Sequence, residues 1–459
     1  MGDIKPVVLD EEEIVSLLTT LTEEEISLAG SRALVPIKKP VFFEGVPASA
    51  RVKDLDGKEY IDFTSQAWTL SVGFCHPDVC FAAIEQIKHL THIRNHFFTV
   101  PRVKLINKLV EIAPGDLEKV VLNTQGGSVA IEAALKLAMI NKPRAHLFVT
   151  AWGGYHGNTL ATFAATHYMR ELVRFTSFGL DRFVKIPYPY CYRCPFNLEY
   201  PDCSLECLEF SKKMLDKGVG APLIGILIEP ILGSGGDVPP PPEYLKELRK
   251  FCDEARLLLI FDESQTAFGR VGRMFASELF DVVPDIMALT KAIGGGFPVG
   301  ATLARKKLKS FSPAEQHSTF SANPVAFAAA LLNIHVIQKL NLPRRAEEMG
   351  KYVRKRLEEL QEKYEVIGDI RGPGLFIGVE LVKDRKTKEP ANKVTELLQQ
   401  EALQRGLILG LREPDITLKG DIIRNLVHVK PPLVITQEEV DRGIEIFEES
   451  LKAALSQAG

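Results

Sequence analysis

The sequence predicts an α/β protein built around a mostly parallel sheet. Short apolar runs at residues 224–228, 257–261 and 286–289 each end in polar residues, which is the pattern of strands buried on both faces. Helical patterns separate such runs, as they do in sheets whose parallel strands are joined by helices. At 459 residues, the chain is long enough for two domains that share a large buried core.

Composition removes several classes of protein from consideration. The net charge of −3 offers no basic field for nucleic acid, and no apolar run approaches the roughly 18 residues of a membrane span. The N-terminal stretch MGDIKPVVLDEEE lacks the basic, apolar and small-residue sections of a signal peptide. Seven cysteines, an odd number, argue against a secreted disulfide framework. We therefore expect a cytoplasmic protein without nucleic-acid or membrane partners.

The other elements follow from periodicity and turn residues. Helices are predicted at residues 10–31, 77–90, 101–112, 128–136, 244–255, 345–364 and 392–406. Strands are predicted at 119–122 and 146–150, with a hairpin at 50–65 and a glycine-turned pair at 366–382. Long helices and short strands alternate after residue 325, which indicates a separate, smaller domain.

Residues 257–300 are the stretch around which the chain is organised. Asp262 and Glu263 follow one apolar run, and Lys291, with glycines at 294–296, follows the next. Because ligands of open α/β sheets bind beyond the carboxyl ends of the strands, we expect an acid and an amine at one rim. A buried lysine can form a Schiff base and a nearby acid can keep a pyridine nitrogen protonated, as pyridoxal phosphate requires. The alternative is that Asp262 caps a helix and Lys291 is a surface lysine.

The segments DESQTAFGRVGRMFA and PDIMALTKAIGGGFPVGA resemble the signature of the class III (subgroup II) aminotransferases. These are pyridoxal-phosphate enzymes of fold type I. The resemblance implies a large domain with a seven-stranded, mostly parallel sheet between helices, and a smaller α+β domain formed from both termini. We accordingly expect an N-terminal segment at 1–70 that contributes to the small domain, a large cofactor-binding domain at 71–325, and a C-terminal small domain at 326–459.

The resemblance also assigns residues to the cofactor, pyridoxal 5′-phosphate. In the family, the lysine that matches Lys291 carries the aldimine, and the aspartate that matches Asp262 pairs with the pyridine nitrogen. Gln265 corresponds to a glutamine near the 3′-oxygen. The catalytic residues expected from the resemblance are therefore Lys291 and Asp262.

A glycine turn opens a predicted helix at Gly127 and Ser128, where free amides and the helix dipole suit a phosphate. A plain serine N-cap is compatible with this role, because the cap amides are the phosphate ligands. The family usually has a glutamate where Val129 stands. Its ring-stacking aromatic maps to Tyr155, which His156 follows, although a lone loop aromatic more often packs in a core.

Two further positions come from the resemblance. The glutamate of an EP motif, here Glu229, lies near the substrate and cofactor edge in the family. A threonine matching Thr319 sends its hydroxyl across a dimer interface to the partner's cofactor phosphate. Without the motifs, a solvated strand-end acid and an ordinary loop hydroxyl would be the simpler interpretations. The resemblance thus implies a homodimer or a dimer of dimers with shared active sites.

Substrate-side residues are expected at both ends of the chain. Gln66 and Trp68 stand where relatives place such residues, although core packing explains Trp68 equally well. Many family members clamp the substrate carboxylate with an arginine just before a C-terminal PP motif. Here the stretch reads RNLVHVKPPL, with His428 in the arginine's place and Lys430 and Arg424 nearby. A histidine is only partly charged near neutrality, so we expect weak or pH-dependent carboxylate binding and tolerance of amines, ω-amino acids or bulky neutral amino acids, unless Lys430 or Arg424 performs the clamp.

Residues 187–207 form a cysteine-rich loop. It contains Cys191, Cys194, Cys203 and Cys207, in C-x-x-C and C-x-x-x-C spacings. Four thiols at such spacings can hold a structural zinc, form loop disulfides or remain free. The family motifs do not require these cysteines, and no metal ligand is assigned.

The implied reaction is ping-pong transfer of an amino group from an amino acid or amine donor to a 2-oxo acid. The segments EPILGSGG and VKPPL especially resemble dialkylglycine decarboxylases and 4-aminobutyrate aminotransferase-like enzymes. Amino-acid racemases and epimerases share the same site. Decarboxylation and racemisation therefore stay open, because the protein selects among them by orienting the substrate. A cofactor-binding protein without activity would require Lys291 or Asp262 to be inert, and both residues are present.

Overall fold

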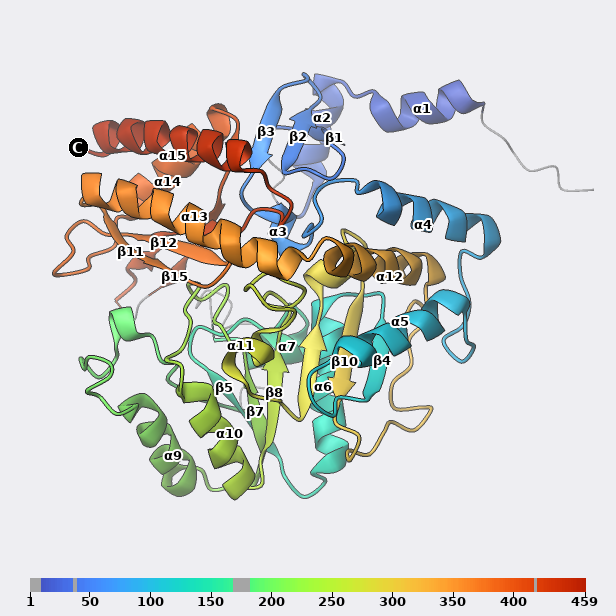
Figure 1. Ribbon diagram of the computed structural model, residues 1–459, viewed down its shortest axis with the longest axis vertical. Helices are drawn as coiled ribbons and strands as arrows, with labels where there is room; N and C mark the ends of the chain where they lie inside the picture. Colours follow the sequence, from blue (N-terminus) through green and yellow to red (C-terminus); the bar gives the residue numbers. More distant parts are fainter. Residues whose placement is uncertain (1–9, 36–38, 168–181, 417–418) are drawn as a thin grey trace, which may run out of the picture.

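The computed structural model describes residues 10–35, 39–167, 182–416 and 419–459 (Figure 1). Residues 1–9, part of the stretch on which the expectation about a signal peptide rests, lie outside this range. None of the described helices alone is long and apolar enough to cross a membrane, and one bent pair, α12 (Pro324–Lys339) with α13 (Leu342–Lys363), meets that test by length and composition only.

A seven-stranded sheet forms the centre of the larger part of the molecule. Its strands, in spatial order, are β4 (Lys119–Asn123), β10 (Gly300–Ala304), β9 (Ile286–Leu289), β8 (Leu258–Asp262), β7 (Leu223–Ile228), β5 (Leu147–Ala151) and β6 (Phe183–Ile186). The pairs from β9 through to β6 are all parallel, and β10 is antiparallel to both of its neighbours. The predicted α/β fold with a mostly parallel sheet is confirmed, and β10 and β6 are strands that the apolar runs did not reveal.

Helices cover both faces of this sheet, because successive residues of each buried strand point to opposite sides. On β8, Leu258 and Ile260 pack with α6 (Gly127–Asn141), whereas Leu259 and Phe261 pack with α10 (Tyr244–Glu254). Further helices in the described portion of this part include α4 (Pro77–His89), α5 (Val100–Ile112), α7 (Leu160–Ala165), α9 (Glu206–Gly218) and α11 (Ala276–Phe280). Burial on two faces explains why β8 reads as a continuous apolar run.

The remaining strands form smaller sheets that join distant parts of the chain. One contains β1 (Phe42–Gly45), β2 (Arg51–Asp54), β3 (Glu59–Asp62) and β13 (Leu407–Ile408). Another contains β11 (Ile367–Arg371), β12 (Ile377–Leu381), β17 (Leu426–Val429) and β14 (Gly410–Leu411), and β15 (Asp415–Ile416) pairs with β16 (Ile422–Ile423). Because β13 pairs with β3 in parallel, the N-terminal hairpin and the C-terminal region share one sheet. The domain boundaries after residues 70 and 325 stay predictions.

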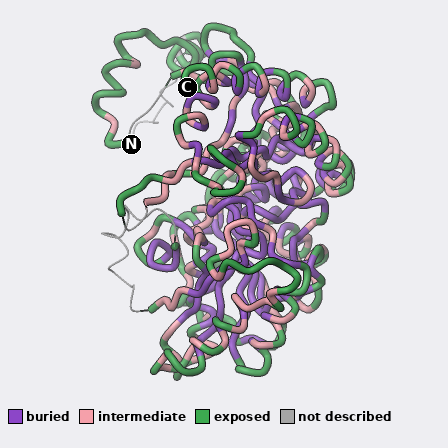
Figure 2. Tube along the Cα trace, turned by 90° about the vertical axis from the view of Figure 1, so that its left-hand side faces the viewer, coloured by how far each residue is buried: buried purple, intermediate pink, exposed green. Residues whose placement is uncertain are grey.

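Helices α13, α14 (Asn392–Gln404) and α15 (Gln437–Ala458) cover these smaller sheets, with α15 packed on α14 (Figure 1). At the N-terminal end of the described chain, α1 (Glu11–Thr19) precedes α2 (Glu23–Arg32), which has no buried residue, whereas the central strands β8 and β9 of the large sheet are buried throughout (Figure 2). The short helix α3 (Ser65–Trp68) lies where the N-terminal hairpin meets the large sheet.

Candidate active site

Two neighbouring parallel strands deliver the acid and the amine to one cavity. Asp262 is the last residue of β8, and Lys291 opens a short 3-10 helix, η4 (Lys291–Gly294), directly after β9 and Thr290. Both side chains line a cavity of about 400 Å³ at the carboxyl rim of the sheet. Four other predicted cofactor residues also line it: Gly127, Ser128, Tyr155 and His156.

The Asp262 carboxylate is buried and well supplied with donors. His156 Nδ1 lies 2.9 Å from Oδ2, and the Ser264 amide and hydroxyl donate to Oδ1 at 3.1 and 2.5 Å. Burial raises the pKa of Asp262, but the hydrogen bond and charge of His156, the Ser264 hydroxyl and the charge of Lys291 outweigh it and hold that pKa below its usual range. Since an ionised carboxylate only accepts, Nδ1 of His156 carries the proton.

Glu229 follows β7 and lies beside this carboxylate. Its two carboxylate oxygens accept the backbone amides of Tyr155 and Gly233, each at 3.0 Å. Burial and the charge of Asp262 raise the pKa of Glu229 to about 7, against the opposing effects of His156 and the two amides. Glu229 therefore fixes the loop that carries Tyr155, although it is not among the residues that line the cavity.

The Lys291 ammonium lies 5.1 Å from the centre of the Trp68 ring. Burial lowers the pKa of Lys291, and the charges of Asp262 and Glu229 oppose this shift. A lysine with a lowered pKa has a larger neutral fraction near pH 7, which is the form that acts as a nucleophile or base.

The start of α6 packs tightly against the loop that follows Tyr155. Gly126 has a φ of +87°, α6 begins at Gly127, and the Asn158 amide donates to the Ser128 hydroxyl at 2.8 Å. A Cβ on Gly157 would lie 2.5 Å from the Ser128 hydroxyl, so only glycine permits this approach. The free amides at this helix start therefore open onto the cavity together with Lys291 and Asp262.

A fully buried polar group beside Trp68 comprises Asp237, His428 and Lys430. The Asp237 carboxylate lies 2.6 Å from His428 Nδ1 and 2.5 Å from Lys430 Nζ. Lys430 also donates to Gln265 Oε1 at 3.1 Å and lies 4.5 Å from the Trp68 ring centre. The structure thus joins Gln265, predicted near the cofactor, to Lys430 and His428, predicted on the substrate side.

The charges in this group are balanced internally. Burial lowers the pKa of Lys430 to about 8, against the opposing charge of Asp237. Burial also lowers the pKa of His428, again opposed by Asp237. For Asp237, burial is outweighed by His428 and Lys430, so its pKa lies below its usual range. Lys430 therefore already has a carboxylate partner inside the protein.

The other predicted residues lie elsewhere. Gln66 belongs to α3, where its backbone amide donates to Asp62 at 3.0 Å. Thr319 is exposed and does not line the cavity of this chain. Arg424 points to Glu396 at 4.0 Å and is not part of the Asp237 group.

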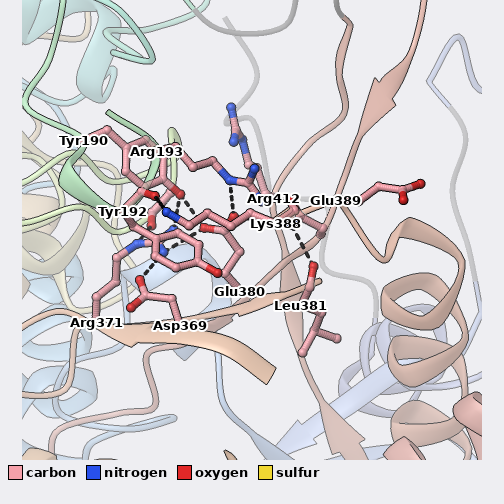
Figure 3. Close-up of polar contacts among 12 residues, drawn as sticks. Tyr190, Tyr192, Arg193, Asp369, Arg371, Glu380, Leu381, Lys388, Glu389 and Arg412 are labelled. Carbon is pink, nitrogen blue, oxygen red and sulfur yellow. Dashed lines mark hydrogen bonds and ion pairs between the residues drawn. The ribbon is translucent and has the colours of Figure 1, made fainter. Parts of the chain in front are cut away.

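Sequence reasoning missed Asp237 and the contacts that place it. It stands in the glycine-rich turn GSGGD after the EP motif, and an acid beside such a turn could have marked Asp237 as a candidate functional residue. The preceding carbonyl, that of Gly236, accepts Arg371 Nε at 2.7 Å. Arg371 in turn belongs to a buried network with Glu380, Tyr190 and Arg193 (Figure 3).

This network attaches the cysteine-rich loop to β11 and β12. Glu380 lies 2.8 Å from Arg371 Nη1 and accepts Arg193 Nε at 2.5 Å (Figure 3). Burial raises the pKa of Glu380, but the two arginines outweigh it and lower that pKa to about 2. The loop is therefore anchored by a buried ionic network.

The four loop cysteines are free thiols arranged around a small cavity. The described residues contain no group of three or more His, Cys, Asp or Glu side chains placed to hold a metal ion. The geometry does not support the structural-zinc hypothesis or the alternative of loop disulfides.

The residues around the main cavity fit pyridoxal phosphate by their chemistry. The start of α6 offers amides to a phosphate, Tyr155 offers a ring, Asp262 offers a buried carboxylate, and Lys291 offers an amine. The fold and this set of groups together define a fold type I pyridoxal-phosphate enzyme.

Comparison with known proteins is in agreement. The family model described as aminotransferase class-III matches residues 42–451, and the chain belongs to this family of pyridoxal-phosphate-dependent transaminases. It is 38% identical to the leucine/methionine racemase of Thermococcus litoralis over 88% of this chain and 89% of that protein. It is 36% identical to the acetylornithine aminotransferase of Methanosarcina mazei, over 87% and 89%, and 34% identical to the isoleucine 2-epimerase of Lentilactobacillus buchneri, over 88% of each.

Solved structures show the same fold. An amine transaminase from an uncultivated Pseudomonas species, in its form with pyridoxal phosphate bound, has a TM-score of 0.81 and 27% identity, and the match covers 92% of this chain and 96% of that one. The predicted cofactor and fold type are thus confirmed.

Proposed function

We propose that the chain transfers an amino group from an amino acid or amine donor to a 2-oxo acid in a ping-pong reaction that uses Lys291. The observation that carries this proposal is that β8 and β9 bring Asp262 and Lys291 to one cavity beside the start of α6. Pyridoxal phosphate, when bound, supplies an electron sink for charge that develops at the substrate Cα.

The residues of the chain take distinct parts in this reaction. Asp262, which His156 and Ser264 keep ionised, holds a proton on a ring nitrogen placed against it. Tyr155 and the α6 amides orient the ring and the phosphate. Lys291 would hold the cofactor through its side-chain amine and, in its neutral form, would take the proton from the substrate Cα. The lowered pKa of Lys291 favours that neutral form.

Racemisation is the second candidate function, because a racemase and an epimerase are among the relatives at 34–38% identity. It uses the same first steps and differs only in returning a proton to Cα. If the proposal is right, purified protein that is given an L-amino acid and a 2-oxo acid should form one molecule of the corresponding new amino acid for each molecule of donor that it consumes. Chiral chromatography distinguishes racemisation, in which the D-form of the donor appears and no 2-oxo acid is formed from the donor. A separate assay for released CO₂ would detect decarboxylation.

We also propose that the chain forms a homodimer or a dimer of dimers. Large apolar side chains are exposed on and beside α4, including Phe81, Phe97, Phe98 and Phe320, and patches of this kind commonly mark protein interfaces. The exposed Thr319 precedes Phe320, so a partner could receive its hydroxyl. Light scattering should give at least twice the 51.0 kDa chain mass, and Thr319→Ala should weaken binding of added cofactor. A monomer with full activity would exclude shared sites.

A cytoplasmic location also belongs to this proposal. It rests on the cysteine content and ordinary composition of the chain. Cell fractionation with a tagged full-length chain tests it.

A further inference from the structure

The segment that carries Trp68 has a backbone conformation that L-amino acids rarely adopt. Four consecutive residues have positive φ angles: Ser65 at +47°, Gln66 at +47°, Ala67 at +58° and Trp68 at +67°. The amides of Trp68 and Thr69 donate to the carbonyls four residues earlier, at 2.9 and 3.0 Å. Helix α3 is thus a single left-handed helical turn without glycine, and each residue is strained by its own Cβ.

Asp62 supplies the side-chain hydrogen bonds that hold the start of this turn. Its carboxylate, fully buried at the end of β3, accepts the Thr64 amide at 2.7 Å, the Thr64 hydroxyl at 2.6 Å and the Gln66 amide at 3.0 Å. These bonds fix the residues on either side of Ser65, where the backbone first enters the left-handed region. A carboxylate with two accepting oxygens suits this arrangement better than an amide does.

A buried arginine holds the same turn from the other side. Arg270 Nη2 donates to the Ser65 hydroxyl at 2.9 Å, and that hydroxyl donates to the Lys430 carbonyl at 2.6 Å. The Lys430 amide donates to the Phe63 carbonyl at 2.8 Å. The turn is therefore tied to the segment that carries His428 and Lys430.

The turn determines where the Trp68 ring lies. The Lys291 ammonium lies 5.1 Å from the centre of the Trp68 ring, and the Lys430 ammonium lies 4.5 Å from it. The His428 ring meets the Trp68 ring edge to face at 5.5 Å and 78°. The Trp68 ring thus contacts both the reactive amine and the buried Asp237 group, and a right-handed or extended backbone here would point the ring in another direction.

We propose that Asp62 is a positioning residue for the substrate side of the cavity: it imposes the left-handed turn at 65–68, and this turn holds Trp68 as a wall beside Lys291. The effect on substrate choice rests on the proposed function, whereas the conformation of the turn does not. A strained segment at such a place is retained when its geometry is needed. Widening or displacing this wall should alter which donor side chains the cavity accepts.

The conformation is tested by thermal melting of the purified full-length protein. Ala67→Gly should raise the melting temperature by about 1–3 °C, because glycine adopts a positive φ without the Cβ penalty. The matched control is Ala453→Gly in the right-handed helix α15, which should lower it, because glycine weakens a helix. A fall in both variants would overturn the left-handed turn.

The role of Asp62 is tested by the exposure of Trp68. The chain has two tryptophans, so Trp152→Phe leaves Trp68 as the one fluorophore of its type. In that background, Asp62→Asn should raise the acrylamide quenching constant of Trp68 about twofold, because the loosened turn opens locally. The matched control is Asp54→Asn, which also removes a turn-capping carboxylate from the same hairpin, at the Asp56 and Lys58 amides.

Substrate choice is the second readout. Asp62→Asn should change the ratio of kcat/KM for L-leucine and L-alanine by about tenfold, since a displaced wall discriminates differently by side-chain size, whereas Asp54→Asn should leave this ratio unchanged. Equal quenching constants in the two variants would overturn the proposal. If the protein shows no covalent cofactor at all, the proposed function fails, but the melting and quenching results still decide the account of the turn.

Discussion

The cofactor side of the cavity and the proposed substrate side, which includes Trp68 next to the cavity residue Thr69, are built in different ways. On the cofactor side, Asp262 and Lys291 stand at the ends of adjacent strands of one sheet, each within its own local motif. On the substrate side, Trp68, Asp237 and His428 come from three distant segments that meet only in the folded protein. The comparison indicates that the chemistry is specified locally, whereas the substrate wall depends on tertiary contacts. Substitutions on the first side should affect every donor equally, and substitutions on the second should separate donors.

The largest effect is expected on the cofactor side. Asp262→Ala should still bind pyridoxal phosphate through Lys291 but lose turnover by roughly a hundredfold to a thousandfold with every donor, because the preorganised charge beside the ring nitrogen is removed. Steady-state rates with several donors and the visible absorbance of the bound cofactor check this. Near-normal rates in this variant would show that the electron sink does not depend on Asp262.

Removal of the Lys430 charge from the buried Asp237 group should lower the free energy of unfolding. Lys430→Met leaves the buried Asp237 carboxylate without its ammonium partner, at a cost of about 3 kcal/mol. The control is Arg424→Met, whose partner Glu396 lies 4.0 Å away at the surface, with an expected change below about 0.5 kcal/mol. Urea denaturation measures both values. If the free energy of unfolding falls by a similar amount in the two variants, then the ion pair between Asp237 and Lys430 does not stabilise this part of the protein.

A smaller effect is expected for donor choice at His428. His428 is buried against Asp237 and does not line the cavity, but arginine is longer and is a permanent two-point clamp for a carboxylate, so His428→Arg should improve α-amino acids relative to amines by about tenfold. Since burial lowers the pKa of His428, the histidine gains charge only below its usual range. Wild-type protein should therefore bind carboxylate donors better as the pH falls, and the variant should lose that dependence.

A donor panel measured at several pH values decides the point. If His428→Arg gains nothing on α-amino acids, while Lys430→Ala or Arg424→Ala abolishes their use, then His428 is not the determinant.

The local motifs allowed the large sheet, most cofactor residues and many element positions to be predicted from the sequence. Adjacent residues show the limit of such reasoning. Asp262 and Glu263 follow the same strand, yet Glu263 accepts the Ala276 and Ser277 amides at 2.7 and 2.8 Å and caps α11. Strand position alone could not distinguish these two roles, and only the family resemblance did.

The substrate wall was harder to predict for a physical reason. The role of Asp237 depends on His428 and Lys430, which lie about two hundred residues away in the sequence, and no periodicity encodes such a contact. The left-handed turn at α3 was also hidden, because none of its four residues is the glycine that usually marks positive φ angles. Strand β10 was missed because its sequence, GATLA, contains small residues rather than a continuous run of large apolar ones.

The central claim is that Lys291, and not the nearby Lys430, forms the covalent link to pyridoxal phosphate. The two amines lie beside the same Trp68 ring, at 5.1 and 4.5 Å from its centre, and of the two only Lys291 is among the residues that line the cavity. Borohydride reduction of the yellow protein followed by peptide mapping tests this directly. We expect one modified peptide, which contains Lys291 and is absent from the Lys291→Ala variant. A label on Lys430 or on any other lysine would contradict it.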